Sequence, residues 1–505
     1  MPFSIQWLYR VQQQISVAPL YRRIINGAVW SLLGVLISRC FTFATTIFIA
    51  RILGADGYGE IGMVQSTIGF FAVFAGFGLG STATKFVAQH RQADQEKTGR
   101  IIVLVVVVGA LFSSVLSLAC AASASLVSTF VLHRPELKLI LNAGAIFLFI
   151  SVMGGIMTAV LTGFEAFKTI AAINVAQAII TPLVSIPLVV AFGTVGAISA
   201  MTVIAAIGLV LSSSCVKKHC LTCGIPIKYV SQIWQERAIL FSFSLPSMMS
   251  ALMMAPAVWI TNSVLVAQEG GYTEFGIFTA ANQWRNLLLI IPTILSSAIL
   301  PILSQAHGTH DTLSFKRIVS FNIHLTWLIS LPLTVVMALF SPVFGALFGE
   351  TFDGVDPLIS VLMIVCFLGL VNGAVGSSFA GSGRMWIGTA MNFVWAIVLI
   401  VTTYLMVPLY GGMGLALSYL ISYTTHTVWQ LIYLELRIAE GAITNHWTLI
   451  ISTIFLLGMC LTIGMLKYNN NLTKIGLSIA SFLPIGIFCI DKILFNRVKQ
   501  EVRRV

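Results

Sequence analysis

The sequence predicts an all-α, polytopic membrane protein with about 14 transmembrane helices. These are expected to form two like-oriented six-helix lobes followed by two C-terminal helices. Hydrophobic residues make up 58% of the 505 residues and charged residues only 9%, whereas soluble domains carry about 25% charged residues. Apolar runs long enough to cross a bilayer, which takes roughly 20 helical residues, recur along the whole chain. Glycine-containing segments also repeat at a nearly constant offset between two halves of the chain.

The elements follow in order from the amino terminus. Segment 1–27 has basic residues but lacks the compact apolar core of a signal peptide, so it is expected to be a cytoplasmic, interfacial segment. The apolar runs that follow have the approximate limits 28–50, 60–84, 101–131, 138–161, 170–192, 195–216, 238–266, 275–303, 318–346, 357–380, 386–408, 412–434, 447–466 and 474–493. They predict an N-lobe over 28–216, a cytoplasmic linker over 217–237, a C-lobe over 238–437, two further helices over 447–493 and a basic cytoplasmic tail over 494–505.

The formal net charge of +11 follows from membrane topology. Of the 28 Lys and Arg residues, 21 fall on the side of the membrane that holds both termini and five on the opposite side. The positive-inside rule therefore predicts that both termini are cytoplasmic. No basic patch with interleaved aromatic residues lies outside the spans, so the charge does not indicate a nucleic-acid partner.

An internal repeat relates the two halves. The segment ARILGADGYGEIG begins at Ala50, and AQEGGYTEFGIFT begins at Ala267. The same offset pairs Gly54 with Gly271 and Gly59 with Gly276, and an offset longer by one position pairs Gly163 with Gly381, Gly193 with Gly411 and Gly196 with Gly414. Two copies of a six-helix bundle would share one orientation, because six is an even number. This arrangement is typical of transporters that hold substrate between the two bundles and rock around it.

Two arginines lie inside predicted spans and are not explained by topology. Arg39 is near the middle of SLLGVLISRCFTFATTIFIA, and Arg285 lies inside the eighth span, in TAANQWRNLLLIIP. A guanidinium at the bilayer centre costs at least about 2.5–3.5 kcal/mol, so such residues face a bundle interior or a wet cavity. No carboxylate lies deep in a predicted span to neutralise them. We therefore expect a cationic cavity that binds phosphate or pyrophosphate, for which guanidinium has bidentate geometry; hydrogen bonding to carbonyls of a broken helix is the alternative.

Other candidate substrate-binding residues flank these arginines. Arg51 and Lys85 end the first two spans, where they would contact substrate or act as interfacial anchors. The neutral or aromatic candidates, which suit recognition of sugars, are Gln65, Asn262, Asn282, Gln283 and Trp284. For most of these neutral groups, hydrogen bonding between helices is the competing interpretation.

The sequence predicts neither catalytic residues nor a metal site. Cys220 and Cys223 form a CxxC beside His219 in KKHCLTCG, but a structural zinc site needs four ligands and no second pair is visible. A reduced thiol pair in a loop is the favoured interpretation. No cofactor is predicted, although either H⁺ or Na⁺ would serve as a coupling ion.

The run ARILGADGYG, from Ala50 to Gly59, and the two-lobe layout resemble the bacterial polysaccharide flippases of the Wzx or PST group. That group belongs to the superfamily of multidrug (MATE), lipid II and polysaccharide exporters (MOP), and the resemblance in layout covers nearly the whole chain. It implies a MATE-like fold and a flippase for undecaprenyl-pyrophosphate-linked repeat units of O-antigen, capsule or exopolysaccharide. The resemblance places Arg39 where lipid II flippases have a first-helix cavity arginine, and Arg51 at the arginine of the ARxLG run.

The resemblance also implies alternating access, a location in the bacterial inner membrane and contact with membrane lipids. A glycan polymerase and a chain-length regulator are further partners that it allows, and we expect a monomer. A cation-coupled multidrug or metabolite exporter is the alternative, although the lack of buried carboxylates argues against a cationic drug. A glycan polymerase or transferase would need paired carboxylates or a large external loop, which the sequence lacks. A scaffold for other glycan-assembly proteins is the third class.

Overall fold

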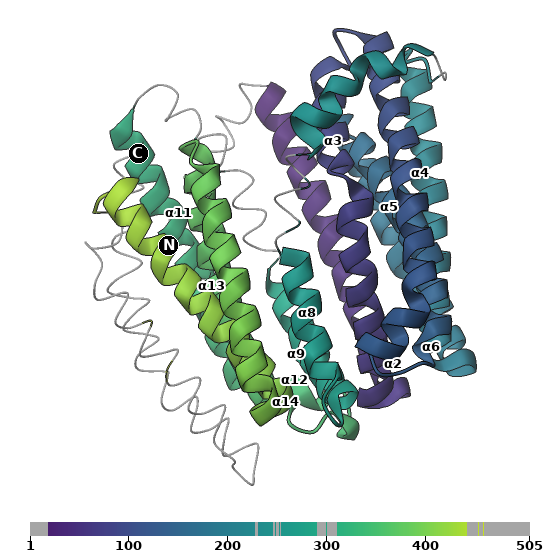
Figure 1. Ribbon diagram of the computed structural model, residues 1–505. Coiled ribbons are helices and arrows are strands. Elements are labelled where there is room, and N and C mark those ends of the chain that lie inside the picture. Colours follow the sequence, from purple (N-terminus) through teal and green to yellow (C-terminus); the bar gives the residue numbers. More distant parts are fainter. Residues whose placement is uncertain are drawn as a thin grey trace, which may run out of the picture. The chain divides into compact units, whose positions relative to one another are not determined.

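The computed structural model describes residues 19–227, 231–245, 254–289 and 311–441, with a few single positions between and after these ranges. Every element in them is helical (Figure 1), which confirms the all-α fold class. The chain divides into two compact units. Unit 1 comprises Met1–Ile52 and Thr67–Leu252, and unit 2 comprises Leu53–Ser66 and Met253–Val505. The predicted spans within 447–493, the tail 494–505 and most of segment 1–27 lie outside the described residues.

Unit 1 is a helical bundle in which the helices between Leu79 and Thr222 pack against one another. Its elements are α2 (Pro19–Gly76, except for its Leu53–Ser66 part), α3 (Leu79–His90), α4 (Gln95–Leu126), η1 (Val127–Val131), α5 (Leu137–Gly163), α6 (Phe167–Thr222), η2 (Ser231–Arg237) and η3 (Leu240–Ser244). A cluster of buried apolar side chains joins α3, α4, α5 and α6, and Leu79, Val105, Ile156 and Leu161 lie within it. Burial of such side chains is the main favourable contribution to packing of the described helices.

Unit 2 repeats much of this order. Its elements are the Leu53–Ser66 part of α2, α8 (Met254–Val266), α9 (Gly271–Leu288), α11 (Thr312–Leu339), α12 (Ser341–Ala346), η4 (Glu350–Phe352), α13 (Val355–Gly381) and α14 (Met385–Arg437). Helix α13 packs against α9, α11 and α14, so it is the central helix of the described part of this unit (Figure 1).

Seven helices in the described ranges are long and apolar enough to cross a membrane. Three of them, α2, α6 and α14, have 58, 56 and 53 residues, which is more than twice the roughly 20 residues that one crossing needs. Each contains one glycine outside the helical conformation, namely Gly54, Gly193 and Gly411. Two predicted spans thus fall within α6 and two within α14, one on either side of the glycine, whereas α2 contains the first predicted span and only part of the second. The count of about 14 crossings stays a prediction.

The second predicted span, 60–84, is interrupted in the structure. Phe77 and Gly78 have φ angles of 44° and 64°, which end α2 and start α3. Left-handed backbone is readily adopted by glycine and costs other residues roughly 1–2 kcal/mol. Hydropathy alone cannot detect this break, because the residues on both sides of it are apolar.

The repeat register predicted from glycines is confirmed by the helix limits and by backbone conformation. Helices α5 and α13 both have 27 residues, and they begin at Leu137 and Val355, which are paired by the offset that pairs Gly193 with Gly411. Gly193 has φ 57° and ψ −134°, and Gly411 has φ 55° and ψ −131°. Such a conformation is essentially confined to glycine. The two units therefore bend the chain at equivalent positions by the same local means.

Asp94 and Asp311 are the N-cap residues of α4 and α11. They are equivalent in the repeat by the shorter offset, the one that pairs Gly59 with Gly276. The Asp94 carboxylate accepts a hydrogen bond from Lys97 N at 2.8 Å, and Asp311 accepts one from Ser314 N at 2.9 Å. The latter bond lowers the pKa of the Asp311 carboxyl below its ordinary value, because it stabilises the charged form. The single residue that separates the two registers therefore lies between Asp311 and the start of α13.

Candidate functional site

A close crossing of two helices organises the polar residues of unit 2. Gly59 on α2 and Gly276 on α9 are equivalent positions of the repeat, and they meet at this crossing. A Cβ atom on Gly59 would lie 2.0 Å from the carbonyl oxygen of Tyr272, and one on Gly276 would lie 1.8 Å from that of Ala55. Only glycine permits such an approach of two backbones. The ARILGADGYG motif therefore has a packing role in this unit.

Polar side chains link α2 with its neighbours just beyond this crossing. Asn262 on α8 donates from Nδ2 to Ser66 Oγ at 2.9 Å. Gln283 on α9 donates from Nε2 to Tyr58 Oη at 3.3 Å. These bonds bring the predicted candidates Asn262 and Gln283 to the same stretch of α2. In each amide the NH₂ group is the one that is engaged.

Arg285 lies two residues further along α9 and is half-buried. Its guanidinium carbon is 5.5 Å from the centre of the Tyr419 ring on α14, a cation–π contact. Its backbone carbonyl accepts a hydrogen bond from Cys366 Sγ at 3.7 Å. No ion pair to Arg285 is present among the described residues, so an aromatic face rather than a carboxylate accompanies this charge.

Three polar atoms of this cluster are buried and have no hydrogen-bond partner among the described residues: Asn262 Oδ1, Asn282 Oδ1 and Arg285 Nε. An unpaired buried polar atom costs about 1–3 kcal/mol, so an unexplained set of them indicates a place for a ligand or water. Arg285 Nε can donate to an anion, and the amide oxygens can accept from hydroxyl groups. The cluster could therefore satisfy a phosphorylated and hydroxylated molecule.

The remaining candidates of unit 2 differ in exposure. Gln65 is exposed on α2. Trp284 is buried, and its ring lies 4.6 Å from that of Phe344, so it packs inside the unit. The structure thus brings Asn262, Gln283 and Arg285 to one region, whereas Trp284 contributes its ring to packing.

The candidates Arg39, Arg51 and Lys85 belong to unit 1, and all three side chains are exposed. Arg39 has no hydrogen bond or ion pair with a described residue. One turn beyond it, the Thr42 hydroxyl donates to the carbonyl of Ser38 at 2.8 Å. The ammonium of Lys85 lies 4.1 Å from the centre of the Phe243 ring, a cation–π contact within the unit.

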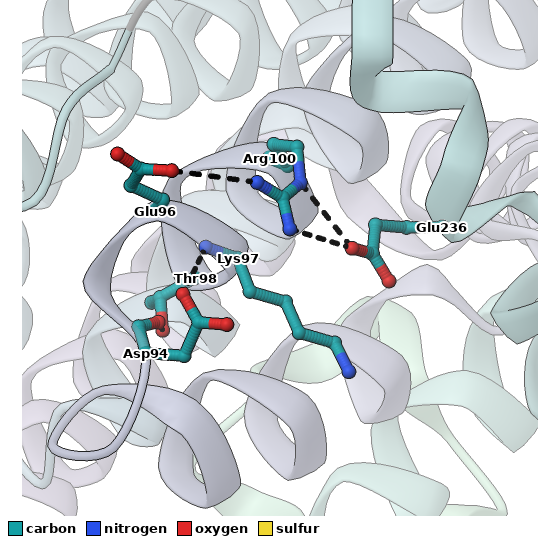
Figure 2. Close-up of polar contacts among 6 residues, drawn as sticks. All are labelled: Asp94, Glu96, Lys97, Thr98, Arg100 and Glu236. Atoms are coloured by element: carbon teal, nitrogen blue, oxygen red, sulfur yellow. Dashed lines mark hydrogen bonds and ion pairs between the residues drawn. The ribbon is translucent and has the colours of Figure 1, made fainter.

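Arg100, another cation of unit 1, is held by two carboxylates and so is less available for a ligand (Figure 2). Arg100 on α4 donates to Glu236 Oε1 from Nε at 3.3 Å and from Nη2 at 3.2 Å. Its Nη1 lies 3.9 Å from Glu96 Oε2. Glu236 belongs to η2, so this ion pair holds the segment that follows α6 against the start of α4.

Cys220 and Cys223 lie at the end of α6, where Cys220 is buried in the apolar cluster and Cys223 is exposed. No group of three or more His, Cys, Asp or Glu side chains suited to a metal ion occurs in the ranges that the structure describes. The sequence predicted a reduced thiol pair in a loop, but Cys220 lies within α6 and Cys223 caps the end of that helix.

Sequence reasoning missed Tyr58 and Tyr419, the aromatic members of the cluster. A usable signal existed in the twelfth predicted span. Tyr419, Tyr423, His426 and Gln430 recur there every three or four residues, which places them along one side of a helix. A polar stripe in an apolar span indicates contact with protein or a cavity rather than lipid.

The fold defines the class of protein. A solved multidrug-resistance MATE family transporter of the MOP superfamily, in an inward-facing conformation, superposes with a TM-score of 0.65 over 81% of this chain and 98% of that chain, at 16% identity. At that identity the likeness shows the fold, and the chain has the fold of MOP-superfamily transporters. The predicted MATE-like architecture is thereby confirmed.

The family follows from sequence comparison. A family model described as polysaccharide biosynthesis protein matches residues 48–357, more than half of the chain, and the chain belongs to this family. A candidate O-antigen transporter of Shigella flexneri is 24% identical over 78% of this chain and 94% of its own length. The EPS I polysaccharide export inner membrane protein EpsE of Ralstonia nicotianae is 24% identical over 40% of this chain. That match spans 46% of the length of EpsE. The resemblance to the Wzx group of the MOP superfamily is confirmed.

Proposed function

We propose that this protein is a flippase of the bacterial inner membrane. Its substrate would be an undecaprenyl-pyrophosphate-linked oligosaccharide unit of O-antigen, capsule or exopolysaccharide, moved from the cytoplasmic to the periplasmic leaflet by alternating access. Membership in the polysaccharide biosynthesis family supports a glycan substrate. The relatives named for O-antigen transport and polysaccharide export, together with the transporter fold, support translocation rather than catalysis.

The observation that carries this proposal is the state of Arg285. A guanidinium on a predicted membrane span has a buried Nε without a hydrogen-bond partner, and no carboxylate among the described residues pairs with it. A pyrophosphate oxygen would accept from this group, in a bond about twice as strong as a neutral one. The unpartnered oxygens of Asn262 and Asn282 would accept from sugar hydroxyls.

The other candidates would contribute in smaller ways. Arg39 is exposed and has no hydrogen bond or ion pair with a described residue, and from unit 1 it would offer a cation to a phosphate group. Arg51 and Lys85, which are also exposed, would attract the anionic head group before or after transit. Gln65, Gln283 and Trp284 would line the path of the glycan or hold its walls in place.

The proposal also includes the coupling ion, the orientation in the membrane and the partner proteins. Coupling to H⁺ or Na⁺ would drive the cycle, with no bound cofactor. Both termini would face the cytoplasm, as the distribution of Lys and Arg predicts. The protein would act as a monomer among membrane lipids, and it would deliver its product to a glycan polymerase and a chain-length regulator.

The test is export of surface glycan by a strain whose own copy is replaced by variants. Arg285→Ala should lower the amount of surface glycan about 10- to 100-fold, because a hydrogen bond to a charged group contributes about 1.5–3 kcal/mol. Arg285→Lys should retain part of the activity, since it keeps the charge but loses the bidentate geometry. Glycan would be quantified by gel and normalised to folded protein in the membrane.

Arg384→Ala is the matched control. Arg384 is exposed, and its Nη1 donates to the carbonyl oxygen of Arg437 at 2.6 Å, outside the polar cluster. This variant should export glycan at the wild-type level. Wild-type export by both Arg285→Ala and Arg39→Ala would show that the phosphate-binding mechanism is wrong. Drug resistance conferred on a pump-deficient host, without glycan export, would favour the drug-exporter alternative.

A further inference from the structure

A second buried polar cluster lies elsewhere in unit 2. His426 and Gln430 are one turn apart on α14, and Asn372 is on α13. Their exposed fractions are 7%, 4% and 8%. Nδ1 of His426 is 3.2 Å from Asn372 Nδ2, and its Nε2 is 3.2 Å from Gln430 Nε2. An imidazole is thus held between two carboxamides, and all three side chains are more than nine-tenths buried.

The numbers of hydrogen-bond donors and acceptors show which protonation states of His426 this arrangement can accommodate. A neutral imidazole offers one donor and one acceptor, so at least one of the two amides must turn its oxygen toward the ring. An imidazolium offers two donors, and both amides can then present oxygen. Asn372 Oδ1 and Gln430 Oε1 are buried without a partner when the amides present nitrogen. Rotation of the amides therefore provides matched partners for either protonation state of His426.

The neighbouring helices bring few charges to this position. In the described part of the chain, α8 carries no titratable side chain. The titratable groups on the helices packed nearby are Cys366 and Asp356 on α13, Tyr272, Glu274 and Arg285 on α9, and Tyr404, Tyr410, Tyr419, Tyr423, Tyr433, Glu435 and Arg437 on α14. Helix α11, which packs against α13, carries Lys316, Arg317 and His324. Arg285 contacts Tyr419, which is about 10 Å before His426 along the helix. The Glu435 carboxylate is about 14 Å beyond it and accepts from Gly441 N.

The repeat shows that the bundle does not need this cluster to fold. In the register that pairs Gly193 with Gly411, the residues Asn372, His426 and Gln430 correspond to Gly154, Gly208 and Ser212 of unit 1, which are small. The space beside Gly208 is occupied by the single carboxamide of Gln177, whose Nε2 would lie 2.1 Å from a Cβ at Gly208 and donates to the carbonyl of Ile204 at 3.2 Å. Since a related unit packs with small residues at these positions, the costly buried polar groups of unit 2 require another explanation.

We propose that His426, Asn372 and Gln430 form a proton-binding site within unit 2, and that its protonation and release energise transport. The proton passes from water to the imidazole lone pair, the two amide oxygens accept from the resulting N–H groups, and the proton later returns to water. The link to transport rests on the proposed flippase function, whereas proton binding does not. The proposal favours H⁺ over Na⁺, because the central group of the site is an imidazole, whose nitrogen binds a proton.

Proton binding can be measured without any substrate. The full-length protein, labelled with ¹⁵N-histidine, would be reconstituted in liposomes and titrated by solid-state NMR from about pH 8 to about pH 3.5, a range extended on the acid side because burial disfavours a charged imidazole. The resonances that disappear in His426→Gln are those of His426. They should change from neutral imidazole to imidazolium within this range. Asn372→Leu and Gln430→Leu should each weaken proton binding about tenfold, because each removes one acceptor.

His324→Gln is the matched control for this titration. His324 is a half-buried histidine on α11, whose Nδ1 bonds to the carbonyl of Ser320 at 2.6 Å. This variant should leave the His426 resonances and their midpoint unchanged. A His426 that stays neutral throughout the titration would overturn the site, as would an unchanged midpoint in the Asn372→Leu, Gln430→Leu double variant.

A second measurement tests the link to transport. His426→Gln should lower surface glycan at least tenfold, and the residual export should no longer respond to a protonophore, while His324→Gln should retain both properties. Full, protonophore-sensitive export by His426→Gln would overturn the coupling. A titrating His426 in a protein that exports no glycan would instead leave the proton site standing and refute the flippase function alone.

Discussion

The two compact units use closely corresponding helices but bury different chemistry. Unit 1 joins α3, α4, α5 and α6 through apolar side chains such as Val105 and Ile156. Unit 2 places Asn372, His426 and Gln430 in its interior, and it leaves Arg285 without a carboxylate partner among the described residues. The units therefore share the glycines and helix caps that direct the backbone, while they differ in the polar side chains that they bury.

The largest loss of stability is expected for a substitution at the crossing of α2 and α9, where the two copies of the repeat motif are in contact. In Gly276→Val, the new Cβ would lie 1.8 Å from the carbonyl oxygen of Ala55, so α2 and α9 must separate. We expect a loss of about 3 kcal/mol or more in unfolding free energy, at or beyond the upper end for overpacking. The yield of monodisperse protein in detergent should fall accordingly. Gly69→Ala, where nothing lies within 4 Å of the added Cβ, should behave as wild type; a normal yield of Gly276→Val would refute the close crossing.

The next largest difference in unfolding free energy is expected between substitutions of equivalent arginines near the start of α4 and α11. Arg100 and Glu236 have side-chain exposures of 19% and 13%, whereas Arg317, the repeat equivalent of Arg100, is exposed. Arg100→Ala should lower the unfolding free energy by about 2 kcal/mol, because it leaves a mostly buried carboxylate unpaired. Arg317→Ala should change it by less than about 0.5 kcal/mol. Equal losses in a detergent unfolding assay would show that the ion pair in Figure 2 does not stabilise the unit.

A smaller difference should separate the equivalent glycines at the bends of α6 and α14. Gly193→Ala should cost about 1–2 kcal/mol, because alanine must adopt a φ of 57° there. Gly411→Ala should cost more, since its Cβ would also lie 3.2 Å from the carboxylate carbon of Glu274. Glu274 accepts from Gly412 N at 3.1 Å, and the added methyl would disturb that bond. The comparison fails if Gly193→Ala is the more damaging of the two in thermal unfolding.

The smallest effect concerns Glu165, which has a φ of 57° where unit 2 has Gly383 with a φ of 71°. Its carboxylate pairs with Arg91, and the Glu165 side chain is 39% exposed. Glu165→Gly should be nearly neutral, because relief of backbone strain offsets the loss of a pair that contributes about 0–1 kcal/mol. Glu165→Ala loses the pair without that relief, so it should be about 1 kcal/mol less stable than Glu165→Gly. Identical unfolding curves for the two variants would contradict strain at this position.

Much of the architecture could be predicted because it depends on local patterns. Apolar runs indicated membrane helices, and glycines such as Gly193 and Gly411 indicated the repeat, since each needs a backbone conformation that other residues avoid. Asn282, Gln283 and Arg285 are close together in the sequence, but their neighbours on α2, α8 and α14 could not be predicted from it. The break at Phe77 and Gly78 was missed, because hydropathy does not report φ angles.

The sequence by itself determined which segments are apolar enough to lie in a membrane and how its two halves align. Hydropathy is a property of each segment alone, and the matching glycines can be compared directly along the chain. Only the tertiary structure decided which polar groups are satisfied. It paired Arg100 with Glu236, placed Arg285 against Tyr419 and enclosed His426 between two amides. The physical reason is that the partners of a buried polar or charged group come from segments far apart in the sequence. Periodicity along one helix cannot identify those partners.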